Sequence, residues 1–253
     1  MSFHTRTDLA AEARRLCSGE GSALAALPGV RYEAGEIFGL PLESLAISAG
    51  EGALRLGKAP GRYDTLCLPS HLGRGEGEFE RCVRAVASLI RRCLPARADS
   101  VLVAALGNPD ITPDALGPLA AESILVTRHL KQQHPADFSS FCSLALCRPG
   151  VLGTTGMESA LQVLTLCREL KPDLVLVIDA LAGAEAEHLC RTVQITDAGI
   201  APGSGVGNDR MEFSRESLGL PVVSVGMPTV VDAALFGGES VSGMFVTPRS
   251  IDF

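Results

Sequence analysis

Uninterrupted apolar runs recur along the chain from about residue 100 onward. Such runs are typical of strands that are buried on both faces of a sheet, because no polar face alternates with the apolar one. Each run is short enough for a strand and is bounded by turn residues or polar residues. The pattern predicts strands at Val101–Leu106, Ser143–Leu146, Leu174–Ile178, Thr192–Ile195 and Val222–Val225.

Stretches with helical spacing of apolar residues lie before and between these runs. One helix is predicted within Glu76–Leu94, where Phe79, Val83, Val86 and Ile90 would share one buried face. The remaining helices are predicted at Ala115–Lys131, Gly156–Leu170 and Thr229–Phe236. For the second of these three, Thr155 and Glu158 have the spacing of a capping box.

Strands that alternate with helices predict an α/β fold with a mostly parallel central sheet flanked by helices on both faces. Residues 21–70 differ, because three β-like segments there are separated by Gly and Pro, which predicts an N-terminal β-rich elaboration. Residues 1–20 read as a charged helical arm with Thr7 or Asp8 as N-cap. The whole chain, 1–253, is expected to form a single domain.

Composition and charge narrow the classes of function. Hydrophobic residues make up 46% of the chain, enough for a buried core, and the net charge of −7 comes without any Lys/Arg block. Direct nucleic-acid binding is therefore not expected. No apolar run is long enough for a membrane span, and the N-terminus lacks the apolar core of a signal peptide. Eight scattered cysteines without a C-x-x-C pair indicate free thiols in a reducing cytoplasm.

The stretch GNPDITPDALGP, residues 107–118, follows the first apolar run directly and leads into a helical pattern. Thr112, Pro113 and Asp114 have the composition of a helix start, with Thr as N-cap. Asp114 would then lie at the mouth of the sheet, where open α/β folds bind their ligands. The Gly107-Asn108 turn would let the backbone approach a ligand closely. The alternative is that Asp114 only complements the helix dipole.

Asp179 ends the apolar run LVLVID and is the second candidate acid. An acid placed directly after a buried strand is partly desolvated, which raises its pKa into the range of a general acid or base. If Asp114 and Asp179 converge, their repulsion would separate their titrations, so that one stays protonated while the other activates water. The alternative for Asp179 is a loop N-cap for the segment that begins at Ala180.

A glycine-rich loop, APGSGVGND at residues 201–209, is the third candidate. Its backbone N–H groups at Gly203, Ser204, Gly205 and Gly207 could cradle a substrate; the alternative is a structural turn. The loop matches neither a dinucleotide-binding fingerprint nor a P-loop, and this argues against a nucleotide-binding module. None of the five histidines forms an H-E-x-x-H motif, so no metal ligand set and no cofactor are predicted.

Six motifs in order then identify a family. The chain resembles the germination proteases of spore-forming bacteria from Arg6 to about Pro248. The motifs are RTDLAAEA, GNPDITPDALGPLAAESILVTRHL, PGVLGTTGMES, KPDLVLVIDALA, TVQITDAGIAPGSGVGNDR and LGLPVVSVGMPTVVDA. The resemblance implies an endopeptidase that degrades small acid-soluble spore proteins when a spore germinates. Members of that family are regarded as atypical aspartic peptidases, and their two essential aspartates match Asp114 and Asp179.

The resemblance also implies how the enzyme is made and where it acts. Members are zymogens and homotetramers of the spore core, and their maturation at the RTDLA motif implies a cut here between Asp8 and Leu9. Residues 1–8 would be the propeptide and 9–253 the mature enzyme. The stretch Gly107–Pro118 is also similar to the G-N…D-x-x-G-x-G-P stretch of hydrogenase maturation proteases, whose acidic site binds a metal. Metal-dependent hydrolysis at the same two acids is therefore an alternative. The chain departs from the family after Ala233, where a long segment is usual and only 234–243 precedes MFVTP.

Overall fold

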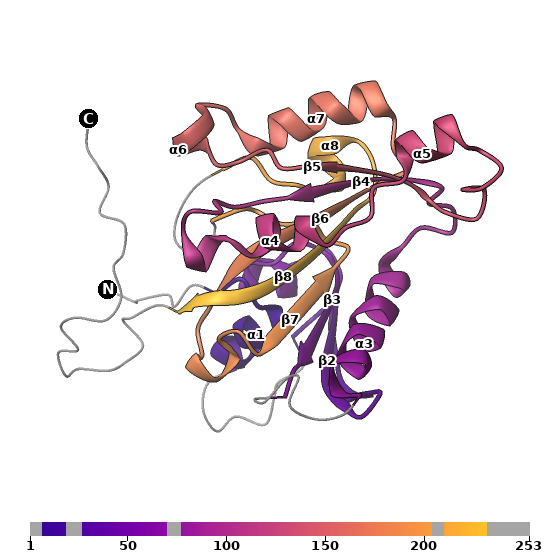
Figure 1. The fold of residues 1–253 in the computed structure, drawn as a ribbon. Helices are drawn as coiled ribbons and strands as arrows, with labels where there is room; N and C mark the ends of the chain where they lie inside the picture. The colour runs from indigo at the N-terminus through magenta and orange to yellow at the C-terminus, as the bar shows by residue number, and fades with distance from the viewer. Residues whose placement is uncertain (1–6, 19–26, 70–76, 204–209, 232–253) are drawn as a thin grey trace.

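One mixed sheet of eight strands forms the centre of the molecule in the computed structural model, which describes residues 7–18, 27–69, 77–203 and 210–231. The strand order across the sheet is β1-β2-β3-β7-β8-β6-β4-β5 (Figure 1). The strands are β1 (Val30–Ile37), β2 (Leu40–Ile47), β3 (Gly61–Cys67), β4 (Ser100–Ala105), β5 (Ser143–Cys147), β6 (Leu174–Gly183), β7 (Thr192–Thr196) and β8 (Val222–Val231).

The expectation of a mostly parallel sheet is wrong. Parallel pairing is confined to β5/β4, β4/β6 and β6/β8, whereas β1/β2, β2/β3, β3/β7 and β7/β8 pair antiparallel. β1 and β2 are joined by a two-residue hairpin turn, with φ of 50° at Phe38 and 70° at Gly39. β7 explains the error, since all five of its residues are buried although its neighbours run opposite to it. An apolar run reports burial on both faces and not strand direction.

The helix predicted within Glu76–Leu94 is confirmed as α3, Glu78–Cys93. Its buried face is not the predicted one, because Cys82, Ala85 and Leu89 are buried while Phe79 and Val83 are 60% and 49% exposed. The two stripes lie side by side on the helix, and the smaller side chains allow α3 to approach the sheet closely. Val86 and Ile90, from the predicted face, are partly buried against the same core.

One predicted helix is broken into two, and another begins later than predicted. The stretch 115–131 forms α4 (Leu116–Glu122) and part of α5 (Arg128–Gln133). The stretch 156–170 forms α7 (Ser159–Leu170) after a separate turn, α6 (Leu152–Thr155), because Gly156 has a φ of 68° and ends α6. The capping-box prediction is wrong, since Glu158 precedes α7 without a side-chain capping bond.

The predicted helix at 229–236 is also wrong in its described part, because β8 continues to Val231; residues 232–236 lie outside the described residues. The sequence patterns did not indicate several short helices. These are α2 (Glu51–Leu56), α8 (Arg215–Leu218) and the 3-10 turns η1 (Thr112–Asp114) and η2 (Ala186–His188). The N-terminal arm begins its helix, α1, at Ala10 and continues to Ser18.

Apolar clusters cover the two faces of the sheet unequally. On one face a single cluster joins α3 to the sheet, with Leu42 and Leu174 among its members. On the other face there are two clusters, one under α1 and α2 with Leu45, and one under α7 and α8 with Val175. Neighbouring residues of a strand point to opposite faces, which fixes this assignment. The face with two clusters has a polar strip between them.

None of the helices in the described part of the chain has the length and apolar character needed to cross a lipid bilayer.

Candidate active site

Asp114 ends the turn η1 at the edge of the parallel half of the sheet. The backbone N–H of Asn108 donates to Asp114 Oδ2 at 2.9 Å and to the Asp114 carbonyl oxygen at 3.0 Å. Thr229 Oγ1 on β8 donates to the carbonyl oxygen of Pro113 at 2.6 Å, which ties the turn to the sheet. The predicted helix start is thus a 3-10 turn, and Thr112 does not act as an N-cap. Asn108, predicted to contact substrate, orients Asp114 through its backbone.

Two glycines allow this turn to approach the sheet. Gly107 has a φ of 116°, and a Cβ added there would lie 2.0 Å from the Asp114 carbonyl oxygen. A Cβ on Gly117, in α4, would lie 2.1 Å from the carbonyl oxygen of Leu106 and 2.8 Å from that of Ile178. Both approaches are closer than any side chain permits, so only glycine can hold Asp114 beside β4 and β6.

Asp179 lies within β6 rather than at its end, because the strand continues to Gly183. Its side chain is 5% exposed, and Oδ1 accepts a hydrogen bond from the Ala180 N–H at 2.9 Å. The neighbouring residue on β8 is Gly226. A buried acid with one backbone donor in the described part of the chain is poorly stabilised as an anion.

The two acids act on each other electrostatically. Burial is the largest cause that raises the pKa of Asp179 to about 8, and the negative charges of Asp114 and Asp8 add to it. Burial also raises the pKa of Asp114, against the hydrogen bond from Asn108 and the positive charge of Arg210, which lower it. At neutral pH this arrangement favours a protonated Asp179 beside an ionised Asp114, the division of roles that an acid and a base require.

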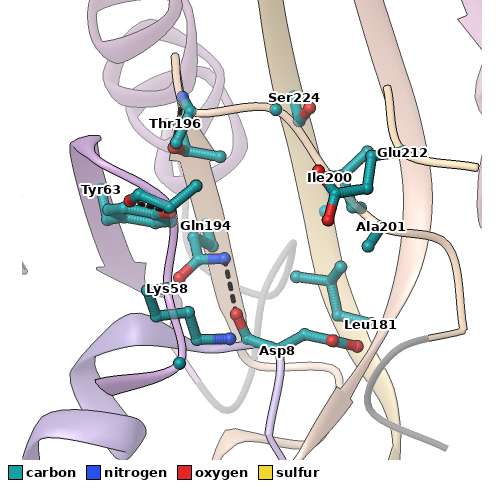
Figure 2. A pocket seen from close by; sticks show the side chains of 15 residues that line it. Asp8, Lys58, Tyr63, Leu181, Gln194, Thr196, Ile200, Ala201, Glu212 and Ser224 are labelled. Atoms are coloured by element: carbon teal, nitrogen blue, oxygen red, sulfur yellow. Dashed lines mark hydrogen bonds between the residues drawn. The ribbon is translucent and has the colours of Figure 1, made fainter. Parts of the chain in front are cut away.

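A polar row crosses the sheet from Asp179 toward the antiparallel half. In register, Asp179 pairs with Gly226, Gly226 with Gln194, and Gln194 with Thr65, so these positions share one face. Beside the row lies a cavity of about 190 Å³ (Figure 2). Its polar lining comes from Asp8, Lys58, Tyr63, Gln194, Thr196, Glu212 and Ser224. The cavity therefore occupies the strip between the two apolar clusters of this face.

The segment Thr7–Leu9 lies at one end of this cavity, in contact with β6 and β7. The Asp8 N–H donates to the carbonyl oxygen of Ala182 at 2.8 Å, and the Ala182 N–H donates to Asp8 Oδ2 at 2.8 Å. Gln194 Nε2 donates to the Asp8 carbonyl oxygen at 3.1 Å (Figure 2). The predicted cleavage junction, Asp8–Leu9, is thereby held three residues along β6 from Asp179.

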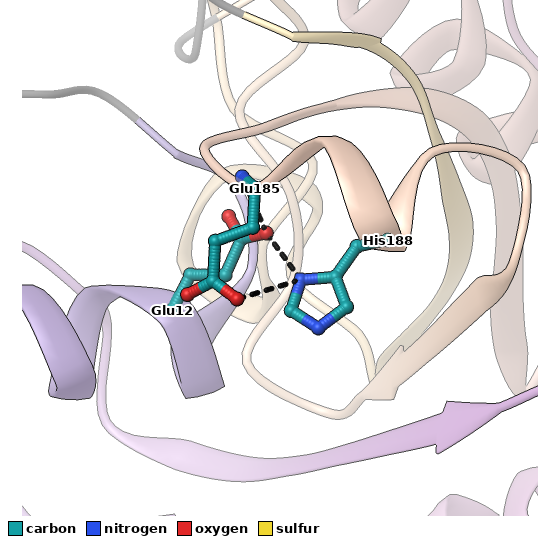
Figure 3. A group of neighbouring side chains, drawn as sticks. All are labelled: Glu12, Glu185 and His188. Carbon is teal, nitrogen blue, oxygen red and sulfur yellow. Dashed lines mark hydrogen bonds and ion pairs between the residues drawn. The ribbon is translucent and has the colours of Figure 1, made fainter. Parts of the chain in front are cut away.

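A buried ion pair fastens α1 to the same end of β6. Glu12 is fully buried, and its Oε1 lies 2.6 Å from His188 Nδ1 (Figure 3). Burial alone would raise the pKa of Glu12, but hydrogen bonds from His188, Thr7 and the N–H groups of Ala184 and Glu185 lower it overall. The hydrogen bond to Glu12 raises the pKa of His188.

Glu12, Glu185 and His188 are the only group of three potential metal-ligating side chains found among the described residues. Both oxygens of Glu12 already accept hydrogen bonds, and the Arg15 guanidinium binds Glu185 at 2.9 Å. Both carboxylates of this cluster therefore already bind donors of the protein itself. Asp114 and Asp179 have no third such ligand within the described part of the chain.

The glycine-rich loop is only partly described. Gly203 has a φ of 75°, whereas Ser204, Gly205 and Gly207 lie outside the described residues. Sequence reasoning missed Lys58, Gln194 and Ser224, which line the cavity. A signal did exist for Gln194, which is the one amide in the otherwise apolar or β-branched strand TVQIT.

Neither acid lines the cavity itself, but two electrostatically coupled acids on a mixed α/β sheet are typical of hydrolytic enzymes. Comparison with known proteins gives the family. The germination protease family profile matches residues 8–246. The germination protease of Caldanaerobacter subterraneus subsp. tengcongensis is 42% identical over 238 residues, 93% of this chain and 72% of the relative. Those of Geobacillus sp. and Clostridium perfringens are 38% and 37% identical, over 94% of this chain and 67% and 74% of the relatives.

The chain belongs to the germination protease family and is an endopeptidase.

Proposed function

We propose that the chain is made as a zymogen and begins the degradation of small acid-soluble spore proteins in the core of the germinating spore. The name shared by its relatives supports the setting of germination. The observation that carries the mechanism is the electrostatic coupling of Asp114 and Asp179, with the pKa of Asp179 raised to about 8. Maturation by a cut between Asp8 and Leu9, and assembly as a homotetramer, belong to the same proposal.

In the proposed mechanism, ionised Asp114 takes a proton from water while protonated Asp179 donates to the substrate carbonyl. The water oxygen bonds to the carbonyl carbon, the C–N bond breaks, and the leaving nitrogen takes up a proton from the acid pair. Backbone N–H groups at Gly203–Gly207 would support the developing negative charge. Residues 1–8 would block the site before maturation, and the contacts of Asp8 with Ala182 and Gln194 support this role.

The test is incubation of the chain, after its Asp8–Leu9 bond has been cut, with a purified small acid-soluble spore protein, followed by mass spectrometry of the products. Asp114→Asn and Asp179→Asn should each lower the cleavage rate by at least about 1,000-fold, because each removes a proton-transfer group. Asp110→Asn, an exposed neighbour in the same loop, is the matched control and should cleave like the unchanged chain. Full activity in either acid variant would refute the assignment.

Metal dependence is tested with the same assay after dialysis against a strong chelator. The acid-pair mechanism predicts unchanged cleavage. Activity that is lost and then restored by one divalent ion would replace that mechanism by the metal-dependent alternative.

A further inference from the structure

The side chain of Gln194 forms hydrogen bonds with the main chain on both sides of Leu9. Its Nε2 donates to the carbonyl oxygen of Asp8 at 3.1 Å, and its Oε1 accepts from the N–H of Ala10 at 2.8 Å. One carboxamide thus satisfies an acceptor before Leu9 and a donor after it. The first of these groups is the carbonyl of the Asp8–Leu9 bond itself.

Lys58 hydrogen-bonds to the main chain of Thr7, the residue before Asp8. Its Nζ donates to the carbonyl oxygen of Thr7 at 2.7 Å. Two side chains from separate elements, the loop after α2 and strand β7, therefore hold two consecutive carbonyl oxygens of one peptide segment. These two contacts are made to main-chain groups of the segment rather than to its side chains, as expected of a site that binds peptides as substrates.

The position of Gln194 relative to the acid pair supports the same interpretation. Gln194 and Asp179 are separated across the sheet only by Gly226, a distance of roughly 10 Å between Cα atoms for two strand spacings. Both side chains rise from the same face, and the side chain of Leu181 lies over Gly226 between them. Leu181 would have to turn aside for one peptide to contact Gln194 and Asp179 together.

The cavity beside Gln194 also contains two further polar groups, the Ser224 hydroxyl and the Lys58 ammonium. Ser224 is 2% exposed and lines the cavity, and its hydroxyl has no hydrogen-bond partner among the described residues. Burial lowers the pKa of Lys58, while the charges of Asp8 and Glu12 raise it. When Thr7 and Asp8 leave, Lys58 loses its carbonyl partner and Gln194 Nε2 is freed, still oriented by Ala10. A desolvated ammonium without an acceptor is unfavourable, so the emptied site favours a new peptide carbonyl.

We propose that Gln194 and Lys58 form the main-chain binding subsite for substrates, in which Gln194 donates to the carbonyl of the bond to be cut and Lys58 to the carbonyl before it. The proposal rests on the proposed endopeptidase function and on the cut between Asp8 and Leu9. The uncut segment Thr7–Leu9 occupies this subsite as a substrate would, displaced along β6 from the acid pair.

The experiment compares variants by the intact mass of the full-length chain and, after the Asp8–Leu9 bond has been cut, by steady-state cleavage of a small acid-soluble spore protein. Gln194→Met keeps the side-chain volume and removes the donor, so kcat should fall by about 100-fold, the usual cost of one lost donor to a reacting carbonyl. Lys58→Met should raise KM by about 10-fold with a smaller change in kcat. Gln162→Met is the matched control, because Gln162 on α7 also donates to backbone carbonyls but lies outside the site.

Gln194→Glu separates a catalytic contact from a structural one. The new side chain still accepts from Ala10 in either protonation state, but it donates to a carbonyl only when it is protonated. Its activity relative to the unchanged chain should therefore rise as pH falls, whereas a purely structural role predicts a constant ratio.

A Gln194→Met chain that folds and cleaves within twofold of the unchanged chain would overturn the subsite, as would a pH-independent ratio for Gln194→Glu. If the unchanged chain itself cleaves neither the spore protein nor the Asp8–Leu9 bond, the proposed function fails first and the subsite fails with it.

Discussion

The two halves of the sheet contribute different chemistry. The parallel half, β5-β4-β6-β8, holds both acids, with Asp179 in β6 and Asp114 in the turn after β4. The antiparallel half, β1-β2-β3-β7, supports α1 and α2 and the contacts to Thr7–Leu9 through Gln194 and Lys58. In the proposed mechanism the reacting pair belongs to the parallel half of the sheet, and the antiparallel half holds the peptide.

The largest effect is expected where the parallel half is most tightly packed. In Gly117→Ala the new methyl group would meet backbone oxygens of Leu106 and Ile178, which cannot move without distorting β4 and β6. Unfolding free energy should fall by about 3 kcal/mol or more, and cleavage should be lost with it. Gly35→Ala in the antiparallel half is the control, because nothing lies within 4 Å of the added atom. Chemical denaturation compares the two, and equal stabilities would contradict the difference in packing.

The pH dependence of cleavage should come from the two acids of the parallel half, Asp114 and Asp179. The mechanism requires protonated Asp179, whose pKa is raised to about 8, so kcat should fall about tenfold per pH unit above that value. At the acid end, activity is lost as Asp114 becomes protonated, at a pH above its ordinary 3.8 because burial raises its pKa. A rate profile over the full pH range tests this, and a flat alkaline limb would exclude a protonated Asp179 as the acid.

The ion pair under α1 should matter for stability in the antiparallel half. Glu12→Gln leaves His188 without its buried anion and should lower unfolding free energy by about 2–3 kcal/mol. The contribution of Glu12, whose pKa is lowered, is present above pH 4.5 and is lost as pH falls through its folded value. That of His188, whose pKa is raised, is full below pH 6.5 and is lost as pH rises through its folded value.

Denaturation at several pH values measures this contribution. The stability difference between the unchanged chain and Glu12→Gln should be greatest between pH 4.5 and 6.5. A difference that does not vary with pH would show that the pair contributes by packing alone.

The smallest effect is expected at the boundary between the two halves. Ser224→Ala removes a buried hydroxyl that has no partner among the described residues, so stability should stay the same or rise by about 1 kcal/mol. Thermal unfolding measures the change. A clear destabilisation would show that the hydroxyl is bound, by water or by a residue outside the described part of the chain.

The sequence patterns predicted the strands of both halves. Apolar runs marked β4, β5, β6, β7 and β8, and the three β-like segments within residues 21–70 correspond to β1, β2 and β3. The acids that follow two of the apolar runs marked the candidate site. Strand direction did not follow, because burial on both faces leaves the same pattern in either orientation, as β7 shows. The late start of α7 depends on local geometry, the left-handed φ at Gly156, that spacing does not encode.

The peptide-holding groups were missed for a related reason. Lys58 follows a six-residue helix that has no long amphipathic pattern, and Gln194 acts through contacts with residues more than 180 positions away. Neither contact has a local signature. Asp179 was predicted because it directly follows an apolar run, and Asp114 because it lies in the helix-start pattern of the stretch that follows another such run.

The central claim is that Asp114 and Asp179 form one electrostatically coupled pair in which Asp179 holds a proton at neutral pH. The most direct measurement is an NMR titration of the full chain with ¹³C-labelled aspartate carboxyl groups. One resonance should titrate near pH 8, should be absent in Asp179→Asn, and should shift to lower pH in Asp114→Asn because one repelling charge is gone. If Asp179 titrates in the ordinary range of aspartate, or does not respond to Asp114→Asn, the account of the site is wrong.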